Sequence, residues 1–184
     1  MSTSVNTGTE TLLDFLRQDA GLYGTKEGCN EGDCGACSVI VTGHDGVPRP
    51  MNACILFLPQ LQGRAVRTVE GISGPDGNLH PVQEAMIAKH GAQCGFCTPG
   101  FITTMAAAHA TGQTDFDTAL AGNLCRCTGY APIIRAAEMA ATAPVPKWMQ
   151  DLPPTTGHAS SDAIFCPLSS DELAQWYQQN PEAT

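Results

Sequence analysis

The amino-acid sequence predicts an α+β fold made of two small domains, the first containing short strands and the second helical. Eight of the nine cysteines fall into two groups that lie far apart in the chain. The residues around the two groups differ in their pattern, with β-like runs near the first group and helical segments near the second. With 184 residues, of which 42% are hydrophobic and only 15% are charged, the chain is long enough and apolar enough to bury a core in each domain.

The first domain is expected to open with a helix from Thr11 to Gln18, because Leu12, Phe15 and Leu16 recur at helical spacing. A loop dense in glycine follows from Gly28 to Gly35. β-like runs come next, with an Asp-Gly turn signal at 45–46 after the first of them: Ser38–Val41, Ala53–Leu58 and Arg64–Val69. A helix followed by short strands predicts an α+β unit.

The second domain is expected to be a small helical bundle. Thr98 is a plausible N-cap with Pro99 at the first helical position of its helix. Cys97 and Cys127 each stand just before a helix start, so two helices are expected to point their N-termini at one site. The helical segments are Val82–His90, Gly100–Ala110, Phe116–Ala121 and Ala131–Thr142.

The C-terminal part differs from both domains. Pro, Thr and Ser are frequent after residue 143, which is typical of a linker. Ser169-Ser-Asp-Glu172 offers a capping box for a helix that runs to about Gln179. Because one helix cannot form its own core, this end is expected to be the start of an incomplete domain. The expected segments are therefore 1–72, 73–143, the linker 144–163, and 164–184.

Charge and hydropathy exclude several classes of function. The net charge is −9 and no basic stripe exists, which argues against nucleic acid as the main partner. Residues 1–11 lack the basic start and apolar run of a secretory signal. The uncharged stretch 90–114 is interrupted by Gly, Pro, Thr and Gln, which favours a buried helix over a membrane span. We therefore expect a cytoplasmic protein whose cysteines bind metal rather than form disulfides.

The first cysteine group has the spacing C-x4-C-x2-C…C, the plant-type pattern for a [2Fe–2S] cluster. Gly28, Gly32 and Gly35 allow positive φ and let backbone N–H groups approach bridging sulfides closely. Structural zinc is the alternative, but zinc sites usually show two short C-x2–4-C knuckles and need no glycine-rich wrap. The spacing thus favours an iron–sulfur cluster held by Cys29, Cys34, Cys37 and Cys54.

The second cysteine group combines C-x2-C with C-x-C and is less specific. Zinc, an iron–sulfur cluster and a redox-active disulfide all fit this spacing. A thioredoxin-like disulfide would need βαβ surroundings, whereas these are helical. Helix N-termini beside two of the thiols would favour a negatively charged cluster. Spacing alone leaves zinc and iron–sulfur equally open for Cys94, Cys97, Cys125 and Cys127.

The remaining reactive side chains give weak signals. The five histidines are scattered, and none pairs with a cysteine at Rieske-like spacing. Cys166 is expected to be a small buried apolar residue. No nucleophile elbow, phosphate-binding glycine loop or carboxylate pair stands out. We therefore expect no catalytic residue in this chain.

Three motifs in a fixed order resemble the molybdenum hydroxylase family of xanthine dehydrogenases, aldehyde oxidases and related enzymes. They are Glu27-Gly-Cys-Asn-Glu-Gly-Asp-Cys-Gly-Ala-Cys37, Gln93-Cys-Gly-Phe-Cys-Thr-Pro-Gly100 and Gly122-Asn-Leu-Cys-Arg-Cys-Thr-Gly-Tyr130. The resemblance runs from about residue 11 to residue 142. His80-Pro-Val-Gln83 and the stretch from Ala131 most resemble the small subunits of bacterial xanthine dehydrogenases, and the C-terminal residues from Asp171 are similar to the first helix of their flavin domain.

The resemblance implies a ferredoxin-like β-grasp domain with one [2Fe–2S] cluster and a four-helix domain with another. Cys29, Cys34, Cys37 and Cys54 would hold the cluster that faces the flavin. The cluster nearer the molybdenum cofactor of a partner subunit would be held by Cys94, Cys97, Cys125 and Cys127. The resemblance also implies that Gln93 lies within hydrogen-bonding reach of the pterin and that Cys127 is the ligand closest to it.

The resemblance further implies a function. Electrons from the hydroxylation of xanthine or hypoxanthine would pass from a molybdenum-binding large subunit through both clusters to FAD and NAD. Oxidation of an aldehyde, isoquinoline or carbon monoxide is an alternative, and a zinc-stabilised binding module is a further one. Family members normally begin with a β-hairpin that is missing before Thr11, so the first sheet is expected to expose an edge. The chain ends before the glycine-rich FAD loop, so FAD is expected only in a full-length subunit.

Overall fold

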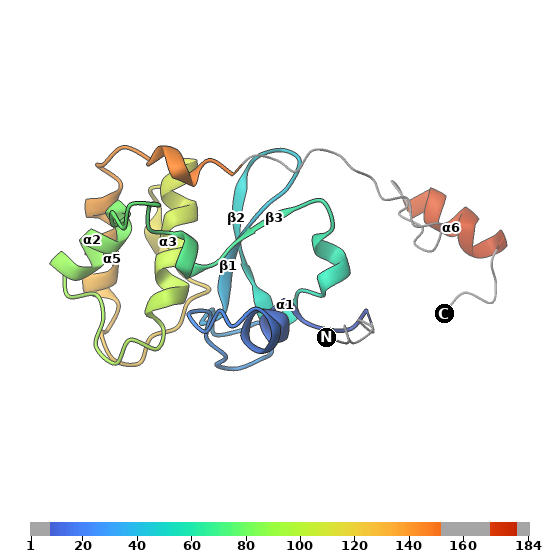
Figure 1. Ribbon diagram of the computed structural model, residues 1–184, viewed down its shortest axis with the longest axis horizontal. Helices are drawn as coiled ribbons and strands as arrows, with labels where there is room; N and C mark the ends of the chain where they lie inside the picture. The colour runs from blue at the N-terminus through green and yellow to red at the C-terminus, as the bar shows by residue number, and fades with distance from the viewer. Residues whose placement is uncertain (1–7, 152–169, 180–184) are drawn as a thin grey trace.

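The structure is a computed structural model that describes residues 8–151 and 170–179. Its helices and single small sheet confirm the predicted α+β class (Figure 1). The strands are β1 Ser38–Thr42, β2 Pro48–Asn52 and β3 Ala65–Arg67. The α-helices are α1 Leu12–Asp14, α2 Pro81–Ala88, α3 Thr98–Thr111, α4 Phe116–Ala119, α5 Ala131–Ala140 and α6 Ser170–Gln179. Short 3₁₀ turns join them at 53–55, 58–61, 69–71 and 147–149.

The first helix begins where its apolar spacing predicted. The Thr11 hydroxyl caps α1 by accepting the backbone N–H of Asp14 at 3.1 Å. After α1 the chain continues as a π-helical turn from Phe15 to Asp19. Leu12 and Leu16 point from these turns into a core that also contains Val39 of β1. The helix therefore covers one face of the sheet.

The sheet has the order β2-β1-β3, and both neighbours of β1 are antiparallel to it. The predicted strand at Ala53–Leu58 is wrong, because that stretch forms a 3₁₀ turn and the strand is β2, just before it. β2 contains Pro48 and Pro50, which argue against a strand in the interior of a sheet. An edge strand tolerates them, because its outward side needs no N–H donor.

All four predicted helices of the second domain are present as α2 to α5. The predicted N-cap at Thr98 is wrong by one residue. Because the Thr98 N–H already donates to the Gly95 carbonyl at 3.3 Å, the turn begins earlier and Cys97 holds the N-cap position. The helix predicted to run to about Gln179 is confirmed as α6, whereas Ser169 and Cys166 lie outside the described residues. In the described part of the chain, no helix is long and apolar enough to cross a membrane.

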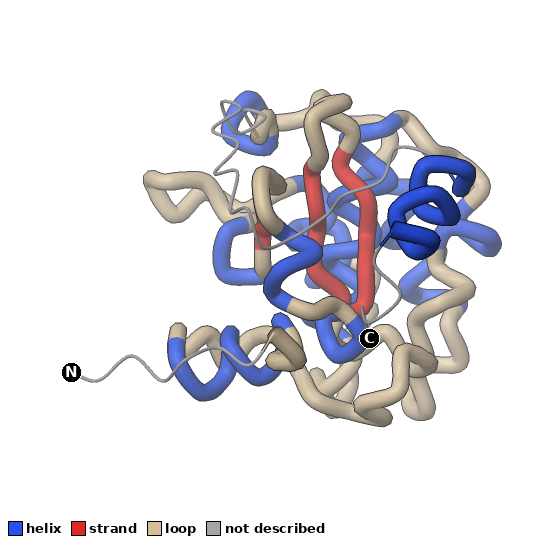
Figure 2. Tube along the Cα trace, turned by 90° about the vertical axis from the view of Figure 1, so that its right-hand side faces the viewer, coloured by secondary structure: helices blue, strands red, loops and turns tan. Residues whose placement is uncertain are grey.

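The two domains share strand β1. Its side chains alternate, so that Val39 and Val41 belong to the core under α1 while Ile40 belongs to the core of the helical domain. All five β1 residues are buried, and α3 packs against β1 and β2. Figure 2 shows the strands in front of the helical domain. The two halves are thus fixed to each other by a strand that is apolar on both faces.

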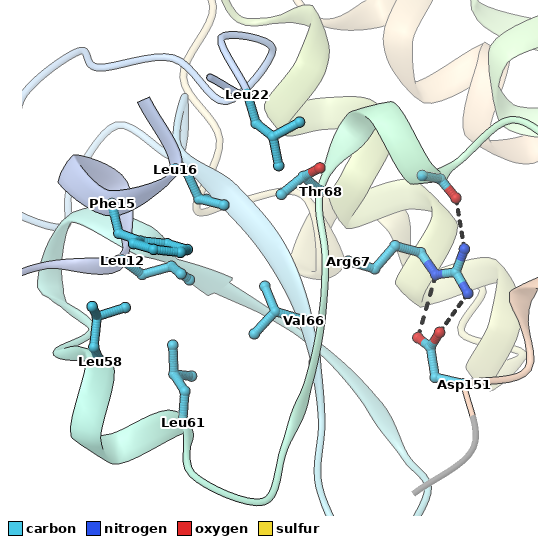
Figure 3. Close-up of a pocket in the computed structure, with 11 residues that line it drawn as sticks. Leu12, Phe15, Leu16, Leu22, Leu58, Leu61, Val66, Arg67, Thr68 and Asp151 are labelled. Atoms are coloured by element: carbon cyan, nitrogen blue, oxygen red, sulfur yellow. Dashed lines mark hydrogen bonds and ion pairs between the residues drawn. The ribbon is translucent and has the colours of Figure 1, made fainter. Parts of the chain in front are cut away.

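The outer edge of β3 has no partner among the described strands. A largely apolar cavity of about 600 Å³ lies beside this edge. Figure 3 shows its lining, with Arg67 and Asp151 at one end. The apolar side chains that line the cavity are Leu12, Phe15, Leu16, Leu22, Leu58, Leu61 and Val66.

Residues 143–151, which we call the strap, run from the end of α5 back to the sheet (Figure 1). The Trp148 indole N–H donates to the Ile72 carbonyl at 3.1 Å. Arg67 of β3 forms an ion pair with Asp151 and donates to the Gly71 carbonyl at 2.6 Å (Figure 3). It also donates to the Trp148 carbonyl at 3.0 Å. The start of the stretch predicted to be a linker is therefore held against both domains.

Arg67→Met should lower the free energy of unfolding by about 2 kcal/mol, because it leaves a partly buried carboxylate and two carbonyls without their donor. Arg49→Met is the matched control, since Arg49 forms a 2.5 Å ion pair with Asp45 in which both side chains are about half exposed. Denaturant unfolding should show a lower midpoint for the first variant and an unchanged midpoint for the second. Equal midpoints for the two variants would contradict the role of Arg67.

A buried histidine pair supports the helical domain. His80 is fully buried and caps α2, its Nδ1 accepting the Val82 N–H at 3.1 Å. Its ring meets that of His109 edge-on, with 5.3 Å between centroids, and His109 Nε2 lies 2.8 Å from the strap carbonyl of Ala143. Burial, with smaller contributions from His109 and Arg67, lowers the pKa of His80 to about 4.

The depressed pKa of His80 makes stability fall as the solution is acidified. An unfolded histidine has a pKa of about 6.5, so below that pH the unfolded chain binds a proton that the folded chain refuses. Neutral His80 contributes its full share to the free energy of unfolding above pH 6.5. As the pH falls towards 4 this share is lost, and the loss amounts to about 3 kcal/mol. His80→Asn keeps a capping side chain but does not titrate. Unfolding midpoints between pH 7 and 4.5 should fall less steeply for this variant; parallel profiles would contradict the assignment.

Candidate metal centres

The first cysteine group gathers at one end of β1. Cys29 and Cys34 lie in the glycine-rich loop, Cys37 directly precedes β1, and Cys54 lies in the 3₁₀ turn after β2. Cys37 and Cys54 are buried, whereas Cys29 and Cys34 are partly exposed. The thiols contact one another in two pairs, Cys29 with Cys34 and Cys37 with Cys54. The 3₁₀ turn at 53–55, where a strand was predicted, thus places the fourth thiol, that of Cys54, near the other three.

Backbone N–H groups of the same loop point at these sulfurs. Cys29 Sγ accepts from the amides of Asp33 and Cys34, both at 3.3 Å, and Cys54 Sγ accepts from Gly32 at 3.2 Å. Gly32 has φ +85°, a conformation that favours glycine. Backbone N–H donors, led by that of Glu31 and then that of Cys34, lower the pKa of Cys29 to about 7, whereas burial raises the pKa of Cys37 to about 12.

A side chain at Gly28 would fill the space that the loop leaves for sulfur. A Cβ atom there would stand 2.7 Å from Cys34 Sγ, closer than atoms in van der Waals contact. The absence of a side chain at this position therefore keeps the sulfur of Cys34 accessible.

The second cysteine group lies where α3 and the loop before α5 meet. Cys94 Sγ is 3.5 Å from Cys127 Sγ, and Cys97 pairs with Cys125. Cys94 and Cys127 are exposed, whereas Cys125 is buried. Burial raises the pKa of Cys97 to about 12. Burial also acts to raise the pKa of Cys125, but hydrogen bonds led by the one from the Thr128 side chain outweigh it and lower that pKa to about 7.

Three further residues support the second group, and no pattern in the sequence marks them individually. The Tyr130 phenol oxygen accepts the Cys125 N–H at 3.0 Å, and the Thr128 hydroxyl lies 3.2 Å from Cys125 Sγ. Asn123 is buried between the two loops. All three stand in the motif that carried the family resemblance, so their positions were visible although their contacts were not. Gln93, predicted to contact a pterin, is exposed beside Cys94.

The paired arrangement fits a [2Fe–2S] cluster, in which each iron takes two cysteine thiolates. Each group supplies two pairs, and both contain thiols with nearby hydrogen-bond donors. Among the described residues, no three His, Cys, Asp or Glu side chains are grouped so that they could hold one metal ion. Four cysteines in each group match the number and kind of ligands that a two-iron cluster requires.

Comparison with known proteins agrees with this donor set. Residues 1–58 match the 2Fe-2S iron-sulfur cluster binding domain family, and residues 68–138 match the [2Fe-2S] binding domain family. The structure is similar to that of quinoline 2-oxidoreductase from Pseudomonas putida 86, with a TM-score of 0.65 and 37% identity over 73% of this chain and 82% of that chain. The chain belongs to the molybdenum hydroxylase family. It corresponds to the iron–sulfur region of that family and contains two [2Fe–2S] binding domains.

Other molybdenum hydroxylases extend the comparison. Xanthine dehydrogenase 1 of Arabidopsis thaliana is 42% identical over 89% of this chain, which spans 11% of its length. Aldehyde oxidoreductase of Desulfovibrio gigas is 39% identical over 77% of this chain and 16% of its own, with a TM-score of 0.65. The chain thus covers a small part of these larger enzymes. Residues 68–138, which contain the second cysteine group, match a [2Fe–2S] binding domain, and this match favours an iron–sulfur cluster over zinc in the helical domain.

Proposed function

We propose that this chain transfers electrons within a molybdenum hydroxylase, with its eight paired cysteines as the ligands of two [2Fe–2S] clusters. A [2Fe–2S] cluster accepts and releases single electrons. The observation that carries the proposal is the pairing of thiols in both loops. Cys29, Cys34, Cys37 and Cys54 would hold one cluster. The other would be held by Cys94, Cys97, Cys125 and Cys127.

A direct contact between the two loops supports electron transfer between the domains. The Leu124 amide donates to the Cys34 carbonyl at 2.9 Å. Cys34 carries a thiol of the first group, and Leu124 is bonded to Cys125, which carries a thiol of the second. One hydrogen bond therefore completes a short path of backbone atoms between the two ligand sets.

The exposed side of the second group supports a partner at that face. Cys94 and Cys127 are exposed, Gln93 beside them is exposed, and Phe96 and Leu124 are each 48% exposed. We assign this face to the molybdenum-binding subunit, with Gln93 contacting the pterin. The first group would then deliver electrons to a flavin domain or subunit that carries FAD. The apolar rings and chains at this face are suited to burial against a protein.

Xanthine or hypoxanthine is the proposed substrate class of the assembled enzyme. The xanthine dehydrogenase of Arabidopsis matches 89% of the chain, further than the aldehyde oxidase 1 of Oryctolagus cuniculus, which is 48% identical over 68% of it. An aldehyde or a quinoline is the second candidate, favoured by the solved structures of aldehyde and quinoline oxidoreductases with similar folds.

Cys34→Ser should remove one cluster and leave the other, since its group and the second group lie in separate loops. Iron content of anaerobically prepared protein should fall to about half, and one of two EPR signals of the reduced protein should disappear. Cys97→Ser is the matched variant and should remove the other signal. Two intact signals in either variant would show that the substituted thiol is no ligand.

Assembly with a molybdenum-binding subunit and an FAD-carrying flavin domain or subunit should yield an enzyme that reduces NAD with hypoxanthine or xanthine. The test is co-purification of the full complex, followed by steady-state assays with purines, aldehydes and quinoline. Turnover of purines at least tenfold faster than of the other classes is the expected result. A preference for aldehydes or quinoline would overturn the substrate assignment, while failure of substrate to reduce the iron–sulfur chain would overturn the electron-transfer role.

A further inference from the structure

The two cysteine loops meet in a junction built from Gly35, Gly100, Gly122 and Asn123. Gly35 follows Cys34 of the first group, Asn123 stands two residues before Cys125 of the second, and Gly100 lies in the first turn of α3. The junction is thus covalently close to both ligand sets. Whatever fixes its geometry also fixes how far apart the two ligand sets lie.

Asn123 ties the loops together with one amide group. It is 4% exposed, and its Nδ2 donates to the Gly35 carbonyl at 2.9 Å and to the Ser38 hydroxyl at 3.2 Å. The Ser38 hydroxyl itself donates to the Gly35 carbonyl at 2.8 Å. The next residue, Leu124, donates its amide to the Cys34 carbonyl. Consecutive residues of one domain therefore bind consecutive carbonyls of the other.

The glycines bring the backbones into direct contact at the same place. A Cβ atom at Gly35 would stand 2.3 Å from the Gly122 carbonyl oxygen and 2.5 Å from Asn123 Nδ2, and Gly35 has φ +68°. A Cβ atom at Gly100 would stand 2.2 Å from the Gly35 carbonyl oxygen. At these glycines no Cβ atom separates the two backbones, so the spacing of the loops depends on backbone contact and on the hydrogen bonds of Asn123 and Leu124.

We propose that Asn123 is a positioning residue that fixes the separation and orientation of the two iron–sulfur clusters. The inference rests on the proposed cluster ligation. Asparagine suits the position because one Nδ2 group serves two acceptors on the opposite loop. Leucine has a similar volume but no donor, so Asn123→Leu would leave the buried Gly35 carbonyl and Ser38 hydroxyl without this partner. The loops would then separate or shift.

Magnetic coupling between the clusters is the direct readout. Each reduced [2Fe–2S] cluster carries an unpaired spin, and the dipolar coupling of two spins falls with the cube of their distance. The full chain, loaded with iron and sulfide, is fully reduced and measured by low-temperature EPR. Splitting of the two signals by each other is expected in the wild-type protein. In Asn123→Leu both signals should remain, with this splitting narrowed or lost.

Gln83→Leu is the matched control. Gln83 Oε1 accepts the His80 backbone N–H at 2.9 Å and the Ser73 hydroxyl at 3.1 Å, so this variant removes comparable amide hydrogen bonds away from the junction. Its intercluster splitting should equal that of the wild type. A splitting in Asn123→Leu that equals the wild-type value, with both clusters present, would overturn the proposal.

Three further outcomes are interpretable. If Asn123→Leu does not retain both clusters, Asn123→Ser is measured in the same way, because serine is too short to reach the Gly35 carbonyl and leaves room for water. Loss of a cluster in both variants would contradict the proposal, since Asn123 would then be needed for folding rather than for spacing. A wild-type chain without two EPR signals would overturn the cluster ligation itself, which separates that failure from a failure of the positioning role.

Discussion

Gathering four thiols around one small object is the constraint on which the rest of this molecule depends. Thiolates that lie close together repel one another, so ionising them costs free energy unless hydrogen-bond donors and iron compensate their negative charge. The first loop meets this demand with backbone amides directed at Cys29 and Cys54. Directing amides inwards requires a tightly curved backbone, and positive φ at Gly32 and Gly35 supplies the curvature. The glycine content of the loop is thus a consequence of its donor chemistry.

The two domains behave as one body because they share both a core strand and a loop junction. Strand β1 places Ile40 in the helical core and its neighbours in the other core, so neither domain buries its apolar surface alone. At one end of this strand, Gly35 meets Gly122 and Asn123. Near the other end, the strap reaches Thr42 and Arg67 through Asp151. An electron carrier needs such rigidity, since transfer between two centres depends on their separation.

Sequence patterns predicted the features that local chemistry determines. The apolar spacing of Leu12, Leu16 and their neighbours located the first helix, and the cysteine spacing indicated the two segments that match [2Fe–2S] binding domain families. The strand predicted at 53–58 was wrong because its apolar residues belong to a 3₁₀ turn that carries Cys54. The true strand, β2, was not predicted because its prolines argue against a strand unless it lies at the edge of a sheet. Contacts between distant residues, such as Asn123 with Gly35, left no periodic signal. The role of the strap was hidden for the same reason, because its Pro-rich composition is also that of a linker.

The central claim is that eight thiols hold two electron-carrying clusters, and a combined metal and spin count tests it most directly. Protein purified without oxygen should contain about four iron atoms and four labile sulfides per chain, which is two for each predicted domain. After full reduction, low-temperature EPR should integrate to about two spins per chain in two distinct signals. A folded, reconstituted chain that contains zinc, or that shows no EPR signal after reduction, would contradict the account.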